Sequence, residues 1–149
     1  MRMEELELVC QQAARTLAER PQRPVPATVV LPLPTATRVL SLPEWPDDDP
    51  ARFDLLDRFA AEVMRPAQAP CFGFVAEALV AGDDGPLDVL LVAYGARGHG
   101  ARITAAPLRD DEVGDFTAAE ELLPTALPFL SPLQHAADAA AAPDSFDLG

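Results

Sequence analysis

The stretch from Cys71 to Ala106 constrains the fold more than any other part of the chain. Its first part alternates as a strand does, with Phe72, Phe74, Ala76, Ala78 and Val80 on one side and Val75, Glu77 and Leu79 on the other. The segment 82–86 has the composition of a turn, and Leu87–Tyr94 is almost continuously apolar, as a central strand covered on both faces would be. With a third strand at Ala101–Ala106, these segments predict an antiparallel meander.

The N-terminal segments predict a helix followed by two short strands. Apolar residues recur at helical spacing over Met3–Arg20, and the prolines that follow prevent the helix from continuing. Thr28–Leu33 and Arg38–Leu42 have strand composition. Because Pro32 lacks a backbone donor, we expect it at a sheet edge or a bulge.

A second helix is expected to begin at Asp49. This residue suits an N-cap, Pro50 suits the first helical position, and the apolar pattern that follows ends before Pro66. Trp45 precedes this helix in a proline-flanked loop, where it either anchors a partner or seals one end of the core. We interpret it as sealing the core.

The C-terminal part predicts further helices. Thr117–Glu120 and Ser131–Gln134 both match capping boxes, which mark helix starts, and Ala136–Ala142 is rich in alanine. The element order is therefore α-β-β-α-β-β-β-α, with an antiparallel sheet of about five strands packed with helices. We predict a single α+β domain over residues 1–142 and a flexible acidic tail at 143–149.

Acidic residues are concentrated at the C-terminal end of the chain. The net charge is −13, and residues 110–149 contain no Arg or Lys. Such an asymmetry favours a basic protein partner or a solubilising tail. The residues predicted to bind that partner are Asp110, Asp111, Glu112, Asp115, Glu120 and Glu121.

Composition argues against several classes of ligand and compartment. A strongly negative chain lacks the cationic patch that supplies most nucleic-acid affinity, and it would be repelled by an anionic membrane. No apolar run reaches the length of a spanning helix, so we expect a soluble cytoplasmic protein. Cys10 and Cys71 are then expected to be reduced and buried. Every basic residue is Arg, which we attribute to the codon usage of a GC-rich genome.

The loop between the second and third meander strands is the main candidate for ligand binding. Three glycines over Gly95–Gly100 allow the backbone to turn and to expose amide groups. Tyr94, Arg97, His99 and Arg102 lie within or beside this loop and are able to close on a carboxylate or phosphate. The alternative interpretation is a glycine-rich hairpin loop with solvated arginines, because the spacing matches neither the phosphate loop that ends in Lys-Ser/Thr nor a dinucleotide-binding fingerprint.

The remaining reactive residues form no recognisable catalytic pattern. Cys71 and His99 are a nominal nucleophile and base, but nothing in the sequence brings them together. The two histidines and two cysteines do not have zinc-site spacing, and His135 is expected to be a packed or solvent-facing side chain. Acid pairs such as Asp83–Asp84 suit turns. We therefore expect no catalytic residue, metal or cofactor.

The sequence as a whole favours a non-enzymatic protein-interaction module, of an adaptor, chaperone-like or assembly type. A homodimer is a possible form, because the apolar meander is able to pack against a second copy. The alternative is a small-molecule anion-binding protein or an enzyme that uses the Gly95–Arg102 loop. A third hypothesis is that the acidic surface imitates nucleic acid and occupies a DNA-binding protein.

Overall fold

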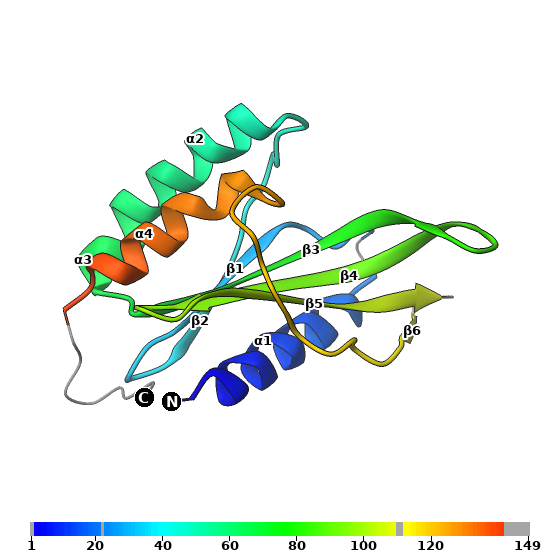
Figure 1. Cartoon of the computed structure of the whole chain (residues 1–149), viewed down its shortest axis with the longest axis horizontal. Helices are drawn as coiled ribbons and strands as arrows, with labels where there is room; N and C mark the ends of the chain where they lie inside the picture. The colour runs from blue at the N-terminus through cyan, green and yellow to red at the C-terminus, as the bar shows by residue number, and fades with distance from the viewer. Residues whose placement is uncertain (1, 22, 110–111, 142–149) are drawn as a thin grey trace.

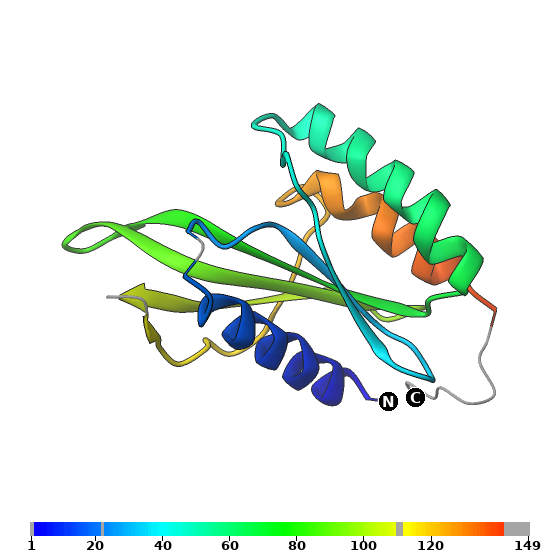
Figure 2. The ribbon, with the colours of Figure 1, turned by 180° about the vertical axis from the view of Figure 1, so that it is seen from behind.

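The computed structural model describes residues 2–21, 23–109 and 112–141 (Figure 1). In this part of the chain, seven strands form an antiparallel sheet in the order β2-β1-β3-β4-β5-β6, and β7 also pairs with β5. Helix α1 lies against one face of the sheet, and helices α2 and α4 lie against the other (Figures 1 and 2). We call these the α1 face and the α2/α4 face. The predicted α+β class is confirmed.

The central meander consists of β3 (Cys71–Gly82), β4 (Gly85–Ala96) and β5 (Gly100–Arg109). These strands are longer than predicted at most ends, and their register places Phe74 opposite Ala93 and Val75 opposite Val92. Asp83 and Asp84 form the tight turn between β3 and β4, and Gly85 supplies the positive φ of 112° that follows them. The β3–β4 hairpin extends beyond the helices that cover the sheet (Figures 1 and 2).

The two short N-terminal strands extend the sheet on the other side of β3. Strand β1 (Thr28–Pro32) is buried along its whole length, whereas β2 (Thr37–Ser41) is mostly exposed and forms the edge. Pro32 belongs to an interior strand, but the pairing of β1 with β3 ends at Val30. The missing donor of Pro32 therefore interrupts no bond of that ladder.

Helix α1 (Met3–Ala18) packs against the sheet through residues at helical spacing. Leu6, Cys10, Ala14 and Leu17 are buried in one cluster with Val75, Leu90 and Val92 of the α1 face. The acidic residues of its first turn and Arg15 in its last turn suit the helix dipole.

The second long helix begins one residue earlier than predicted. Asp48 is the N-cap, and its carboxylate accepts a hydrogen bond of 2.8 Å from the Ala51 amide. Asp49 is thus the first helical residue and Pro50 the second. The helix runs through α2 (Asp49–Phe59), a π-helical turn η1 (Ala60–Met64) and α3 (Arg65–Ala67), so it continues through Pro66 rather than ending before it.

The chain after β5 differs from the prediction of a helix at Thr117–Glu120. Short strands β6 (Glu112–Val113) and β7 (Glu120–Glu121) pair with the edge of β5 instead, which raises the strand count above five. The Thr117 hydroxyl accepts a 3.2 Å hydrogen bond from the Ala105 amide, and the Thr117 carbonyl accepts one of 2.6 Å from the Thr104 hydroxyl. Pairing with the open edge of β5 therefore replaces the capping box.

The last helix, α4 (Ser131–Ala139), also begins one residue earlier than predicted, with Leu130 at the N-cap position, and it lacks the predicted cap. A 3₁₀ turn η2 (Pro128–Leu130) leads into it, and no side-chain cap bond forms at its first turn. Gln134 faces the sheet, where its amide nitrogen donates to the Ala96 carbonyl over 3.0 Å. The helix ends at Ala139, short of the predicted Ala142, and the predicted tail at 143–149 lies outside the described residues.

Candidate functional site

The α2/α4 face of the sheet is longer than the helices that cover it. Beyond the row that contains Phe74, the register aligns three further rows of side chains on this face. We call these residues the outer sheet face: Ala76, Leu91 and Ala105; Ala78, Val89 and Pro107; Val80 and Leu87. All eight are apolar. Val80 is 40 % exposed, Val89 is buried, and the other six are half-buried.

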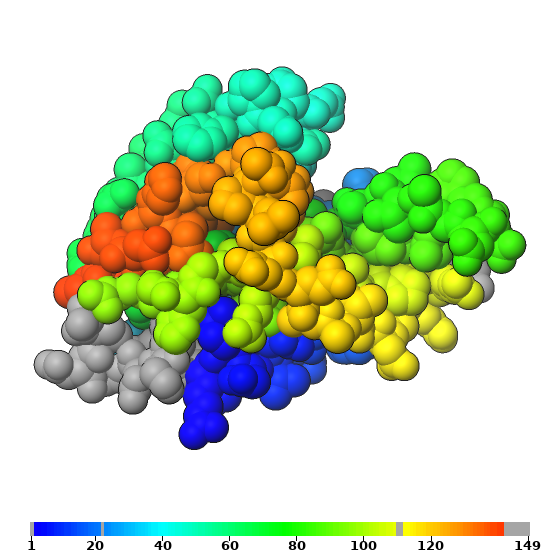
Figure 3. All heavy atoms as spheres, in the orientation of Figure 1, coloured from blue at the N-terminus to red at the C-terminus, as the bar shows by residue number. Residues whose placement is uncertain are grey.

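A groove lies where the outer sheet face meets the helical layer. Its volume is about 720 Å³, and its floor includes Ala76, Ala78 and Leu91. Its wall is an aromatic cluster in which the Trp45 ring lies 5.3 Å from Phe74 and 5.6 Å from Phe129. Figure 3 shows a recess in the molecular surface between this layer and the projecting β3–β4 hairpin.

Trp45 seals the core and also lines the groove. It is half-buried against the core cluster of the α2/α4 face, as the core-sealing interpretation requires. The Arg52 guanidinium lies over the Trp45 ring at 5.4 Å and over the Phe129 ring at 5.6 Å. Such stacking fixes the position of the indole.

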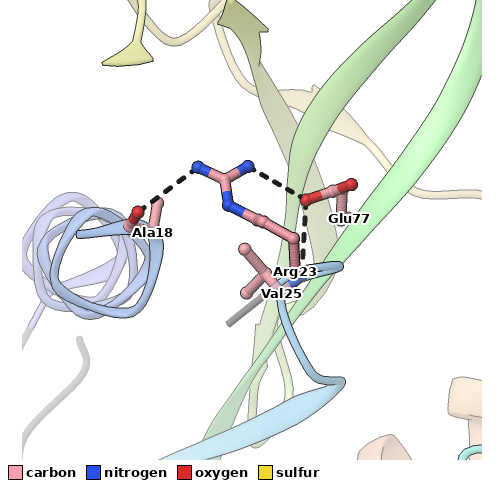
Figure 4. Close-up of polar contacts among 4 residues, drawn as sticks. All are labelled: Ala18, Arg23, Val25 and Glu77. Atoms are coloured by element: carbon pink, nitrogen blue, oxygen red, sulfur yellow. Dashed lines mark hydrogen bonds and ion pairs between the residues drawn. The ribbon is translucent and has the colours of Figure 1, made fainter. Parts of the chain in front are cut away.

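Charged residues surround the groove. Arg23 forms an ion pair of 3.2 Å with Glu77, and the same carboxylate accepts a hydrogen bond from the Val25 amide (Figure 4). Arg23 also donates to the Ala18 carbonyl at the end of α1, so it joins α1 to β3 (Figure 4). Arg52 pairs with Asp49 over 3.7 Å. Both arginines that line the groove therefore form ion pairs with carboxylates of the same chain.

The predicted anion loop is engaged with helix α4. The Gly98 amide donates to the Asp138 carboxylate over 3.0 Å, and the Arg97 guanidinium donates to the Ala140 carbonyl over 2.8 Å. A carboxylate of the protein therefore already occupies one of the backbone donors that the sequence offered to a ligand. These contacts hold the β4–β5 turn against the end of α4.

His99 and Arg102 line a second cavity, of about 430 Å³, between β5 and α4. His135 lines the same cavity, so both histidines of the chain lie at this one site. Gln134 also borders it, and its amide oxygen is buried without a hydrogen-bond partner among the described residues. The sequence had not linked His135 with His99, because 36 residues separate them.

Tyr94 lies on the opposite face of the sheet from the groove. Its buried hydroxyl donates a 2.6 Å hydrogen bond to the Glu7 carboxylate of α1. Burial raises the pKa of Tyr94 most, the Glu7 hydrogen bond and charge raise it further, and Arg102 lowers it. Tyr94 therefore joins α1 to the sheet and does not share a ligand site with Arg97.

Replacing Tyr94 with Phe is expected to lower the free energy of unfolding by about 1–2 kcal/mol, because the bond to a charged but half-buried acceptor is lost. Since the pKa is raised on folding, the contribution of the Tyr94 hydroxyl is complete below the ordinary tyrosine pKa of about 10 and is lost at higher pH. The difference between wild type and Tyr94→Phe in urea denaturation should therefore shrink as the pH rises above that value. A difference that is constant with pH would contradict this assignment.

The predicted acidic partner-binding residues lie along the edge of β5 where they are described. Glu112 belongs to β6, Glu120 and Glu121 belong to β7, and Asp115 lies between these strands. All four are exposed. Asp110 and Asp111 lie outside the described residues.

Both cysteines are free thiols buried on the α1 face. Burial raises the pKa of Cys71 to about 12, and burial together with the nearby Cys71 raises the pKa of Cys10. Because the thiolate is the nucleophilic form, Cys71 is protonated and unreactive at neutral pH. The Cys71 thiol donates a hydrogen bond of 3.8 Å to the Pro32 carbonyl.

Within the described residues, no three His, Cys, Asp or Glu side chains gather in a way that would hold a metal ion. None of the helices in those residues is both long enough and apolar enough to span a membrane. No protein-family model, curated protein or solved structure matches the chain.

The outer sheet face is not among the sites that the sequence predicts. Ala76, Ala78 and Val80 were placed on the same side of the strand as Phe72 and Phe74, and the structure has them there. The sequence signal for this site is the length of the apolar face of β3. A strand of 12 residues extends roughly 40 Å, which is more than one short helix covers.

Proposed function

We propose that the protein is a non-enzymatic protein-interaction module that binds its partner on the outer sheet face and the adjoining groove. One observation carries this proposal: eight apolar side chains share a region of one sheet face that extends beyond the helical layer. Exposing an apolar sheet face to water is unfavourable in free energy, and sheets normally bury such a face against a second layer. The partner would supply that layer.

The acidic residues at the edge of β5 have a secondary role in this proposal. All four described acids are exposed, and none of them lines the groove: Glu112, Asp115, Glu120 and Glu121. Glu121 borders the second cavity instead. Exposed charges at a distance from an interface raise the association rate more than the final affinity. We therefore assign them to steering of a basic partner, with the apolar contact formed at the groove.

Two substitutions at neighbouring residues of β3 test the proposal. Ala78 lies on the groove floor, whereas Leu79 points to the opposite face and is 66 % exposed. Ala78→Arg and Leu79→Arg change the charge equally at adjacent positions. We expect the wild type and Leu79→Arg to recover the same partner from cells that make the protein, and Ala78→Arg to lose it.

Thermal unfolding serves as the control for this comparison. Each variant replaces a partly exposed residue near the hairpin, so we expect changes of about 1 kcal/mol or less in stability. Equal recovery of the partner by Ala78→Arg and Leu79→Arg would remove the outer sheet face from the interface. A variant that unfolds early would be replaced by Ala78→Gln, which carries the same expectation.

A second candidate function is the binding of a small anion in the cavity of His99 and His135. Arg102 beside the two imidazole rings favours it, and the buried, unpartnered oxygen of Gln134 calls for a ligand that also carries a hydrogen-bond donor, such as the hydroxyl of hydrogen phosphate. Titration with inorganic phosphate and with benzoate, followed by NMR of the two imidazole rings, tests it. Shifts that saturate and disappear in His135→Ala would support a ligand site, and unchanged ring signals would exclude these anions.

A further inference from the structure

We propose that the occupant of the groove is an amphipathic α-helix of a partner protein that carries Lys or Arg beside its apolar face. This inference rests on the proposed function and specifies the shape and charge of the partner. It depends on three features of the described residues: which strands form the groove floor, where the helical layer ends, and how the charged residues around the groove are engaged.

The strands of the groove floor favour a helix over an added strand. Ala76 and Ala78 belong to β3 and Leu91 to β4, and these two strands pair with each other along this stretch, whereas the pairing of β1 with β3 ends at Val75. The backbone groups between β3 and β4 are therefore used within the sheet, and the other edge of β3 beyond Val75 has no strand partner among the described residues. Strand addition would extend β3 in the plane of the sheet at that open edge, whereas the groove floor is a face of the sheet. The groove presents side chains only, and an apolar helix face is suited to pack on them.

The helical layer ends where the groove begins. Phe129 of η2 and Trp45, just before α2, form the wall, and the floor continues outward along β3 and β4. A helix in the groove would lie in the same layer as α2 and α4 and would extend their cover over the sheet (Figure 1). It would meet the aromatic wall on one side and the apolar floor beneath.

The charges around the groove favour a basic occupant. Glu44 and Asp47 line the groove beside Trp45, and both are exposed. Asp83 and Asp84 form the turn at the far end of the same hairpin face. Arg52 and Arg23 also line the groove, but Arg52 pairs with Asp49 and Arg23 pairs with Glu77. The acids at both ends are complementary to cationic residues that flank an apolar stripe.

Trp45 provides a direct probe because it is the single tryptophan of the chain and lies in the groove wall. The experiment uses two synthetic peptides of about 18 residues, long enough to form a helix, in which Leu at helical spacing alternates with Lys or with Glu. Trp45 emission is recorded as each peptide is added to the full chain. We expect a saturable blue shift with the Leu–Lys peptide and binding roughly tenfold weaker or worse with the Leu–Glu peptide.

The matched variants locate the binding. Ala78→Arg should weaken the binding of the Leu–Lys peptide by roughly tenfold or more. Leu79→Arg, which adds the same charge on the other face of the sheet, should weaken that binding much less. Equal effects of the two variants, equal binding of the two peptides, or no saturable shift would each overturn the inference. A free protein that is a dimer, and that Ala78→Arg converts to a monomer, would assign the face to a second copy and overturn it as well.

The outcomes separate this inference from the proposed function. If no peptide binds but recovery of the cellular partner still depends on Ala78, the interaction function stands and the helical occupant is wrong. If neither peptide binding nor recovery of the cellular partner depends on Ala78, the proposed interaction function and the helical occupant are both wrong.

Discussion

Replacing Phe74 with alanine is expected to lower the free energy of unfolding by about 3–5 kcal/mol. Phe74 is 1 % exposed and contacts both Trp45 and Phe129, with ring centroids 5.3 and 5.8 Å away. Its removal would leave a cavity between the sheet and the helical layer, and it would also remove two aromatic contacts. For a chain of this size, the melting temperature should fall by roughly 10 °C or more.

Phe53 provides the control for this substitution. It belongs to α2 and is 40 % exposed, so Phe53→Ala should cost less than about 1 kcal/mol. Urea denaturation followed by circular dichroism measures both variants, and Trp45 emission reports whether the groove wall loosens. A cost for Phe74→Ala no greater than that for Phe53→Ala would contradict the packing of the aromatic wall.

Replacing Gly73 with valine is expected to destabilise the fold by about 3 kcal/mol, because α1 lies directly on this part of β3. A Cβ atom at Gly73 would overlap the Cys10 sulfur, and it would lie 3.3 Å from the Cβ atoms of Cys10 and Val30. These atoms belong to short side chains of α1 and β1 that are buried in the core, so none of them moves away cheaply. The helix would have to shift from the sheet.

A double-mutant cycle with Cys10→Ala tests the cause of that loss. Removing the sulfur gives room for part of the new side chain, so Cys10→Ala should cost less in the Gly73→Val background than in the wild type. Gly98→Ala is a control with open space around its Cβ, and its positive φ of 75° should cost about 1–2 kcal/mol. Additive losses in the cycle would contradict the close approach of α1 and β3.

Much of the fold is predictable from local patterns in the sequence. The alternation over Phe72–Val80 and the apolar run over Leu87–Tyr94 correspond to β3 and β4, because period-two burial is a direct consequence of strand geometry. The spacing of Leu6, Cys10 and Leu17 likewise corresponds to the buried side of α1. These elements have one strong signal each, and tertiary contacts reinforce it.

The errors arose where tertiary contacts overrule a local signal. Thr117–Glu120 matches a capping box, but the open edge of β5 offers hydrogen bonds to the same segment, and Thr117 is bound there. Pro66 was expected to end a helix, but it lies in the first turn after a π-helical turn and the helix passes through it. A pattern of a few residues does not report which sheet edge will be available.

The candidate site was less predictable than the fold. The groove joins Trp45, Phe74 and Phe129, which come from three separate parts of the chain. The predicted loop residues are instead divided among different places, since Tyr94 is bonded to Glu7 and Arg97 to the end of α4. Spacing along the chain identifies neither arrangement, because both depend on how the sheet and helices pack.

Site-directed photo-crosslinking tests the central claim most directly. A benzoylphenylalanine placed at position 78 would lie on the groove floor, and one at position 79 would lie on the opposite face of the same strand. Irradiation in the cells that make the protein, followed by mass spectrometry, should give a protein adduct at position 78 whose crosslinked segment is helical and basic, and little or none at position 79. Equal adducts at the two positions, or none at position 78, would contradict an interaction function for the outer sheet face.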